Sequence, residues 1–178
     1  MSIVLSDPTG GKMTKHNSVK DLPALTKLKF SSAEVKEGIW IMYAKKYYND
    51  ELCGGTTDDF KIIEKGVDPH DIRKHNGSMY LLSENTSALT LFKHAYYGGV
   101  HPDPKAYVED SYFDITNDFP TDNDRGASSG IVGNGVPGWK LFTQTSFLGP
   151  SHELTRGERA HDFKSIGVND QVKSLRKV

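Results

Sequence analysis

The sequence is poor in the features that mark disulfide-linked, zinc-binding and membrane-spanning proteins. Its 178 residues contain one cysteine, Cys53, which excludes an internal disulfide and any zinc site built on cysteines. The longest apolar runs are only a few residues, whereas a membrane-spanning helix needs about 20, so we expect no membrane insertion. Residues 1–7 are too short and too uncharged for a signal peptide. We therefore expect a cytoplasmic protein, although export without a signal peptide stays open.

An excess of charge of either sign is also missing. The chain has 22 Lys and Arg residues against 23 Asp and Glu residues, which gives a formal net charge of −1. Nucleic-acid binding and membrane-surface binding usually require a basic excess or a charged segment, so we expect neither. Helical periodicity is lacking too, because no segment repeats apolar residues at a helical spacing over several turns.

What the sequence does contain favours β-structure. Glycine occurs 17 times and proline eight times, between short runs rich in aromatic and β-branched residues. This composition is typical of many short strands joined by turns. The clearest predicted strands cover residues 39–43, 88–92 and 139–142. We therefore expect an all-β protein in which helix is a minor component.

A repeated frame organises these strands: an aromatic residue, four residues, a second aromatic residue, one residue and a glycine. Two aromatic residues at this spacing can stack across a folded hairpin, and the glycine can supply a positive φ. In the first copy, Asp50 takes the place of the glycine. The copies begin at Tyr43, Phe92 and Phe142, and their second aromatic residues are Tyr48, Tyr97 and Phe147.

Each frame is followed, 32 to 37 residues after its first aromatic residue, by a serine that leads into a strand. These serines are Ser78, Ser129 and Ser174, and Ser32 holds the matching place before Trp40. Trp40 and Trp139 stand at equivalent places in the second and fourth repeats. We therefore divide the chain into four repeats, residues 1–36, 37–82, 86–132 and 133–178, each with the four strands of a Greek key.

The hairpin frame, the tryptophan of the even repeats and the late serine resemble the Greek-key signature of the βγ-crystallins. The resemblance covers nearly the whole chain, although residues 1–26 lack the aromatic frame, so the first Greek key is expected to be degenerate. It implies two βγ-crystallin-like domains, residues 1–85 and 86–178, joined near residues 83–87. Each domain would be a β-sandwich of two Greek-key motifs, without enzymatic activity and with a capacity to bind calcium.

The family's calcium motif is N/D-N/D-x-x-S/T-S, and each site combines two Greek keys. One key supplies the second N/D side chain, the next carbonyl and a hairpin carbonyl, and its partner supplies the S/T hydroxyl. Residues 169–174 keep the Asn-Asp half, and residues 124–129 keep the hydroxyl. The resemblance therefore implies one calcium site with Asp170, the carbonyls of Gln171 and Thr143, and the Ser128 hydroxyl. The reciprocal site would bring Arg125 and Lys173 together, and their charges would repel the ion.

The N-terminal half keeps less of this motif. Residues 27–32 retain only the hydroxyl, and residues 73–78 retain neither half, so we predict no calcium there. A shift of register that brings in Asn76 is the alternative.

Two interpretations of the Asn-Asp pair stay open. It can form an ordinary turn that the following serine caps, or it can provide calcium ligands. With one carboxylate, a calcium site would be weak, with a dissociation constant on the order of 10⁻⁵ to 10⁻³ M. The alternative function is a purely structural or protein-interaction module without a bound ion. Domain–domain or homo-oligomer contacts also stay open, as does a role as a subunit of a larger membrane-active complex.

Other motifs do not support an enzyme or a second kind of metal site. Asp122-x-Asp124-x-Gly126 lacks the remaining ligands of an EF-hand, and the seven histidines lack the HxxxH and HExxH spacings. His161, Asp162 and Ser165 lie close together, but no GxSxG elbow presents a nucleophile.

Overall fold

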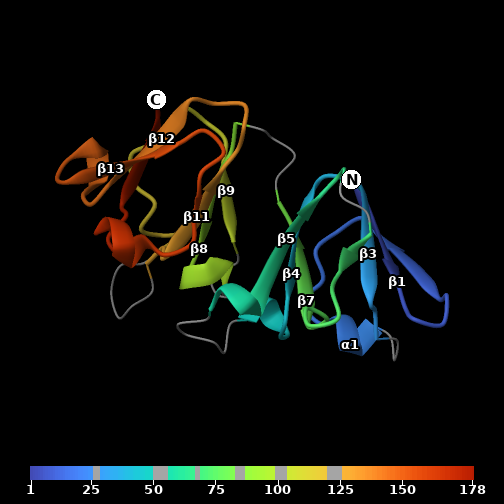
Figure 1. Cartoon of the computed structure of the whole chain (residues 1–178). Helices are drawn as coiled ribbons and strands as arrows, with labels where there is room; N and C mark the ends of the chain where they lie inside the picture. The colour runs from blue at the N-terminus through green and yellow to red at the C-terminus, as the bar shows by residue number, and fades with distance from the viewer. Residues whose placement is uncertain (26–28, 50–55, 67–68, 83–86, 99–103, 120–125) are drawn as a thin grey trace. The chain divides into compact units, whose positions relative to one another are not determined.

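The structure is a computed structural model that describes residues 1–25, 29–49, 56–66, 69–82, 87–98, 104–119 and 126–178 (Figure 1). The contacts divide the chain into two compact units, Met1–Glu84 and Asn85–Val178. Fifteen strands account for nearly all regular structure, which confirms the predicted all-β class. The one α-helix, α1 (Leu22–Leu25), has four residues, and none of the described helices has the length and hydropathy needed to span a membrane.

The N-terminal unit contains two antiparallel sheets. The first has the order β2-β1-β3-β6, with β1 (Ser2–Ser6), β2 (Lys12–Lys15), β3 (Ser32–Glu37) and β6 (His70–Asp71). The second has the order β5-β4-β7, with β4 (Ile39–Tyr43), β5 (Phe60–Glu64) and β7 (Ser78–Leu81). Repeat two thus lends β6 to the sheet of repeat one. In return, repeat one contributes a single bridge, Val19 to Met79.

The C-terminal unit has a complete version of the same exchange. One sheet has the order β14-β11-β8-β9, with β8 (Leu89–Phe92), β9 (Lys105–Tyr107), β11 (Ser129–Val132) and β14 (Arg159–Ala160). The other has the order β10-β15-β12-β13, with β10 (Ser111–Tyr112), β12 (Gly138–Phe142), β13 (Ser151–Thr155) and β15 (Ser174–Lys177). Each repeat gives its third strand to the sheet of its partner. The four strands predicted per repeat are therefore present in repeats two, three and four, and repeat one has three.

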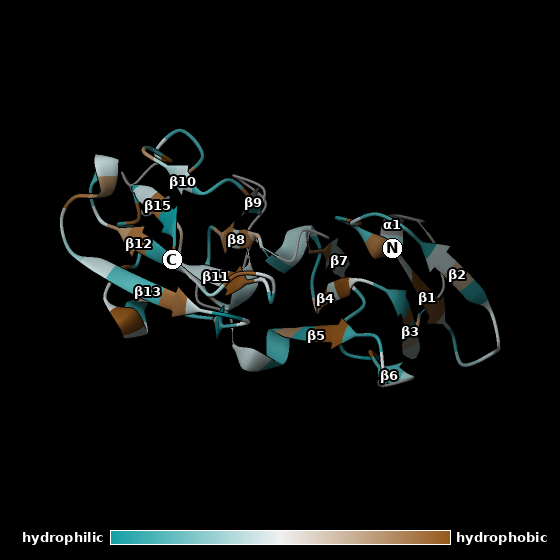
Figure 2. Ribbon diagram, turned by 90° about the horizontal axis from the view of Figure 1, so that it is seen from above, coloured by the Kyte–Doolittle hydropathy of each residue, from teal (hydrophilic) through white to brown (hydrophobic). Residues whose placement is uncertain are grey.

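Each unit buries one hydrophobic cluster around a tryptophan. Trp40 and Trp139 are both 0% exposed, and their Nε1–H groups donate to the carbonyls of Glu37 (3.2 Å) and Ser87 (3.1 Å). The strands follow the burial that this packing requires: β1 alternates, whereas all four residues of β8 are buried. In Figure 2, β8 and β11 accordingly carry brown, hydrophobic residues.

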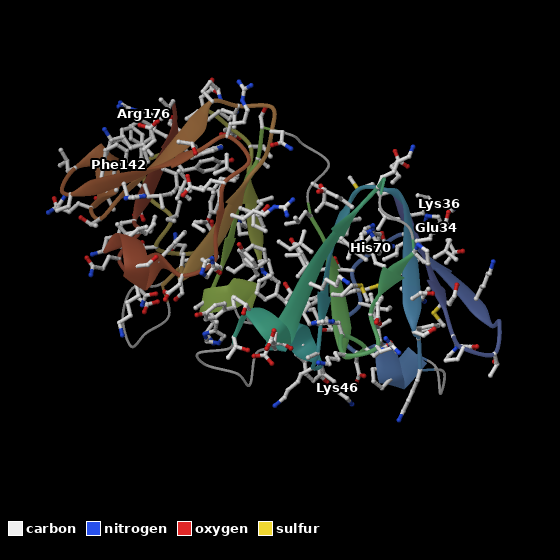
Figure 3. The ribbon with its side chains drawn as sticks, viewed as in Figure 1. Glu34, Lys36, Lys46, His70, Phe142 and Arg176 are labelled. Atoms are coloured by element: carbon white, nitrogen blue, oxygen red, sulfur yellow. The ribbon has the colours of Figure 1, made fainter. Side chains whose placement is uncertain are left out.

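The predicted aromatic pairs do pack against each other. The ring centroids are 5.5 Å apart for Tyr43 and Tyr48, 5.3 Å for Phe92 and Tyr97, and 5.6 Å for Phe142 and Phe147. In repeat four, the guanidinium of Arg176 also lies over Phe142 and Phe147, at 5.8 and 5.4 Å from the ring centroids (Figure 3).

The hairpins close in a way that the sequence pattern did not predict. Gly149 has a positive φ of 75°, as expected, and Gly99 and Asp50 lie outside the described residues. In addition, the second aromatic residue and the residue before it adopt the left-handed conformation in all three frames. These pairs lie in the short 3₁₀ elements η1 (Tyr47–Asn49), η3 (Ala95–Tyr97) and η4 (Thr145–Phe147). Bulky side chains rarely adopt this conformation, so it must be held by other contacts.

The late serine supplies that contact. Ser129 Oγ accepts a hydrogen bond from Tyr97 N–H at 3.1 Å and donates to the His94 carbonyl at 2.7 Å. Ser78 and Ser174 make the same pair of bonds in their own hairpins, and all three serines are 0% exposed. Each buried hydroxyl therefore satisfies two backbone groups of a strained turn. We call this arrangement the serine clamp.

Repeat one closes its hairpin differently. Ser6 pairs with Ser32 at the register where the other repeats place their first aromatic residue opposite the late serine. The turn that follows is organised by the carboxylate of Asp7. Its Oδ1 accepts hydrogen bonds from Thr9 N–H (2.7 Å), Thr9 Oγ1–H (2.7 Å) and Gly11 N–H (3.1 Å). The expected degeneracy of the first key is thus a replacement of the serine clamp by an aspartate turn.

Two further 3₁₀ elements shape the even repeats. The first, η2 (Thr57–Asp59), begins with a capping box in which Thr56 and Asp59 satisfy each other's backbone N–H groups. The second, η5 (Phe163–Ile166), is capped by Asp162 and ends at Gly167, which has a φ of 74°. It buries Phe163 and leads into the loop that carries the candidate site.

Candidate metal centre

The backbone of the C-terminal unit brings the Asn-Asp turn of repeat four against the end of repeat three. Asp170 N–H donates to the Ala127 carbonyl at 3.1 Å, and Phe163 N–H donates to the Ser128 carbonyl at 2.8 Å. Gly126 allows this approach, because a Cβ at that position would lie 2.3 Å from Asp170 Cα. The turn itself depends on the left-handed conformation of Asp170, which has a φ of 55°.

The side chains of Ser128 and Asp170 meet across the two repeats. Ser128 Oγ donates a hydrogen bond to Asp170 Oδ1 at 3.0 Å, and Ser128 is only 7% exposed. The side-chain amide of Asn169 contacts the other carboxylate oxygen, Asp170 Oδ2. A carboxylate and a hydroxyl from different repeats therefore share one small region, as the crossed arrangement of the motif requires.

The two predicted carbonyl ligands are less closely tied to this pair. Gln171 follows Asp170 directly, and its N–H donates to the Val168 carbonyl at 3.2 Å within the same turn. Thr143 lies just after β12, where its N–H and its hydroxyl both donate to the Pro150 carbonyl, at 3.0 and 3.2 Å. The hydrogen bonds that join Asp170 to Ser128 do not include Thr143. Arg125, the expected obstacle at the reciprocal site, lies outside the described residues.

The chemistry of these donors fits a hard cation. A carboxylate, a hydroxyl and backbone carbonyls are oxygen ligands, which calcium prefers and which softer transition metals do not select. No group of three or more His, Cys, Asp or Glu side chains gathers within the part of the chain that the structure describes. Any ion held here would therefore rely on a single carboxylate together with neutral oxygens and water.

The N-terminal unit arranges the same places differently. The Ser31 hydroxyl, which corresponds to that of Ser128, donates to the Ser6 carbonyl at 3.3 Å. The Phe30 carbonyl, which corresponds to that of Ala127, accepts from the side-chain Nδ2–H of Asn76 at 2.7 Å. The alternative register that brings in Asn76 therefore places its amide nitrogen against Phe30. Lys74 stands at the motif position of Asp170.

Sequence reasoning missed two contributors to the C-terminal arrangement. Gly126 is needed because of its contact with Asp170, a residue far away in the sequence, and no local pattern marks it. The positive φ of Asp170 could have been expected from the tolerance of Asp for the left-handed conformation, once the turn itself was recognised.

Paired repeats that exchange their third strands, with a serine clamp in three of the four hairpins, define the βγ-crystallin fold. The chain has this fold, and its resemblance to the βγ-crystallins is confirmed at that level. The solved structure of geodin, a βγ-crystallin from Geodia cydonium, matches with a TM-score of 0.78 and 22% identity, covering 99% of this chain and 98% of that one. The sequence resembles this two-domain protein most in residues 37–43, 91–99 and 169–174.

Two other solved structures match less closely. A βγ-crystallin from Ciona intestinalis has a TM-score of 0.41 and 26% identity, covering 51% of this chain and 99% of that one. Protein S complexed with calcium has a TM-score of 0.36 and 15% identity, covering 99% of each chain. The amino-acid sequence matches no protein-family model and no curated protein at a significant level.

Proposed function

We propose that the protein is a non-enzymatic βγ-crystallin-like structural protein whose C-terminal unit binds one calcium ion weakly. The ion would be held by the Asp170 carboxylate and the Ser128 hydroxyl, with the carbonyls of Gln171 and Thr143 completing the protein ligands. Its effect would be to stabilise the pairing of repeats three and four, because its ligands come from both.

The observation that carries this proposal is the 3.0 Å approach of Ser128 Oγ to Asp170 Oδ1. The two residues lie 42 positions apart, in different repeats, and they are the two side-chain ligands that the motif names. An ordinary turn would need a local partner for Asp170, not a hydroxyl from the neighbouring repeat. Calcium would displace the shared proton from between the two oxygens and bind both.

A purely structural role is the second candidate, and the same contact supports it. The hydrogen bond from Ser128 and the contact with Asn169 already occupy both carboxylate oxygens of Asp170. In that case the pair would join the two repeats without an ion, and calcium would leave the stability of the unit unchanged.

Thermal unfolding of the full chain with calcium and with a chelator separates the two candidates. At a calcium concentration a hundredfold above the dissociation constant, binding stabilises the folded state by roughly 2.7 kcal/mol. We expect this gain in the natural sequence and its loss in Asp170→Ala and Ser128→Ala. Unfolding in chelator gives the stability of each variant without calcium, so a loss of ion binding is distinguished from a loss of folding.

Asp110→Ala is the matched control, because it removes the same charge from the same unit at a side chain that is 94% exposed. This variant should keep the full response to calcium. An equal calcium response in Asp170→Ala and in Asp110→Ala would contradict the proposed site. The absence of a calcium response in the natural sequence would favour the purely structural role.

A further inference from the structure

A basic pocket in the N-terminal unit has no counterpart in the motifs considered so far. It has a volume of about 280 Å³ and is lined by Lys61, Asp71, Arg73, Lys74 and His75. Lys61 comes from β5, and the other residues come from the end of β6 and the loop that follows. Two elements that are distant in sequence therefore bring their basic side chains to one concave surface.

Internal contacts hold part of this lining in place. Arg73 Nε donates to both oxygens of Asp71, at 3.0 and 3.1 Å, and Lys61 Nζ donates to the Asp71 backbone carbonyl at 2.8 Å. This pairing lowers the pKa of Asp71 well below its usual range, with the hydrogen bonds from Arg73 as the main cause. Asp71 thus keeps its negative charge and orients the guanidinium of Arg73, whose remaining N–H groups stay available.

The lining nevertheless has an excess of positive charge. Three cationic side chains face one carboxylate, which leaves two uncompensated charges when His75 is neutral. Burial lowers the pKa of His75, the hydrogen bond to the Asp58 carbonyl opposes this, and the charges of Lys61 and Lys74 lower the pKa further. The nearby carboxylate of Asp59 is engaged by Thr56 in the capping box.

We propose that this pocket binds a small oxyanion of the phosphate type. Its volume fits a single phosphate group, and its excess charge matches a dianion. Arginine and lysine provide charge-assisted hydrogen bonds to phosphate oxygens, and here they converge from two elements with one arginine already oriented. The ligand is a freely diffusing anion, because the pocket has room for little beyond the charged group itself.

The inference is independent of the calcium proposal, because it concerns the other unit and the opposite charge. Lys74 stands at the motif position that Asp170 occupies in the C-terminal unit. Equivalent places in the two units would therefore attract ions of opposite sign.

Nuclear magnetic resonance titration of the full chain with inorganic phosphate tests the proposal. In a calcium-free buffer, phosphate should shift the backbone amide signals of residues 71–75, and chloride at matched ionic strength should not. Lys74→Gln should raise the dissociation constant for phosphate about fivefold or more, because it removes one of the uncompensated charges without shortening the side chain.

Lys12→Gln is the matched control, since Lys12 is an exposed lysine on β2 of the same unit. It should leave the dissociation constant for phosphate within about twofold, as expected for a distant, screened charge. Equal shifts with chloride and phosphate would overturn the proposal, and so would equal effects of Lys74→Gln and Lys12→Gln. Asp170→Ala should leave phosphate binding intact, so failure of either proposal can be recognised separately.

Discussion

The two units of this protein share a backbone design and differ in the side chains placed on it. In the C-terminal unit, Phe163 N–H donates to the Ser128 carbonyl (2.8 Å), and Ile115 N–H donates to the Lys173 carbonyl (2.9 Å). In the N-terminal unit, the corresponding bonds run from Ile72 to Ser31 (3.0 Å) and from Leu22 to Gly77 (2.9 Å). Each repeat thus donates one backbone bond to its partner in both units.

The difference lies in what occupies the place between the repeats. In the C-terminal unit, a hydroxyl meets a carboxylate from the partner repeat. In the N-terminal unit, Ser31 bonds within its own repeat and an amide from Asn76 takes the neighbouring carbonyl. The comparison teaches that the paired Greek keys do not need an ion site to form. The backbone exchange holds the repeats together, and the chemistry of the shared loops can vary.

The largest expected effect concerns the buried tryptophans, which test how far the two units are alike. Each packs in the hydrophobic cluster of its own unit and is fully buried. Trp40→Ala and Trp139→Ala should each destabilise the affected unit by about 3–5 kcal/mol, the usual cost of deleting a buried aromatic side chain. Hydrogen exchange should show the loss of protection in that unit first. Equal loss in both units after one substitution would break the comparison.

The next effect tests the difference between repeats with and without a serine clamp. Ser129→Ala should cost about 1–3 kcal/mol, because it leaves the Tyr97 N–H and the His94 carbonyl without their buried partner. Ser32→Ala, at the matching place in repeat one, should cost within about 0.5 kcal/mol, because Asp7 organises that hairpin instead. Chemical denaturation of both variants measures the two costs.

Equal losses of stability in Ser129→Ala and Ser32→Ala would show that repeat one depends on its serine after all. Ser129→Thr provides a further check, since it keeps the hydroxyl but adds a methyl group at a position with no exposed surface. Its cost would reflect crowding, and a combination of normal hydrogen exchange at Tyr97 with reduced stability would separate crowding from loss of the clamp.

Much of the fold was predictable because its determinants are regular in the sequence. The aromatic frame, the late serine and the paired tryptophans recur at constant places, so they identify the repeats without any knowledge of distant contacts. The left-handed conformation of Tyr97 and Phe147 was not predictable from residue type, because bulky residues disfavour it. It is stabilised by a serine some 30 residues away, which only the folded hairpin brings near.

The candidate site was predictable in part for the same reason. The motif named Ser128 and Asp170, and the exchange of strands brings them together. The position of the Thr143 carbonyl depends on the course of its hairpin, which the motif does not specify. The pocket around Lys74 was missed because Lys61 joins it from another strand, and no spacing in the sequence connects the two.

The smallest expected effect is a pH dependence confined to the N-terminal unit, and it rests on His75. Burial lowers the pKa of this side chain in the folded protein, and Lys61 and Lys74 add to the effect despite the opposing Asp58 carbonyl and Asp59 charge. The unfolded chain, with a pKa near 6.5, therefore takes up a proton before the folded chain does. Stability should fall as the pH drops from about 6.5 towards the lowered pKa, and should be unaffected by His75 above that range.

His75→Gln should remove this part of the pH dependence, and the two proteins should differ most in slope between pH 6.5 and the lowered pKa. Denaturation across this range, followed by signals from the N-terminal unit, makes the measurement. An unchanged slope in His75→Gln would show that the charges around Lys74 do not govern the histidine. Phosphate should reduce the slope in the natural sequence, because a bound dianion offsets the lysine charges that disfavour protonation. That result would sharpen the contrast between a unit that responds to anions and protons and one that responds to calcium.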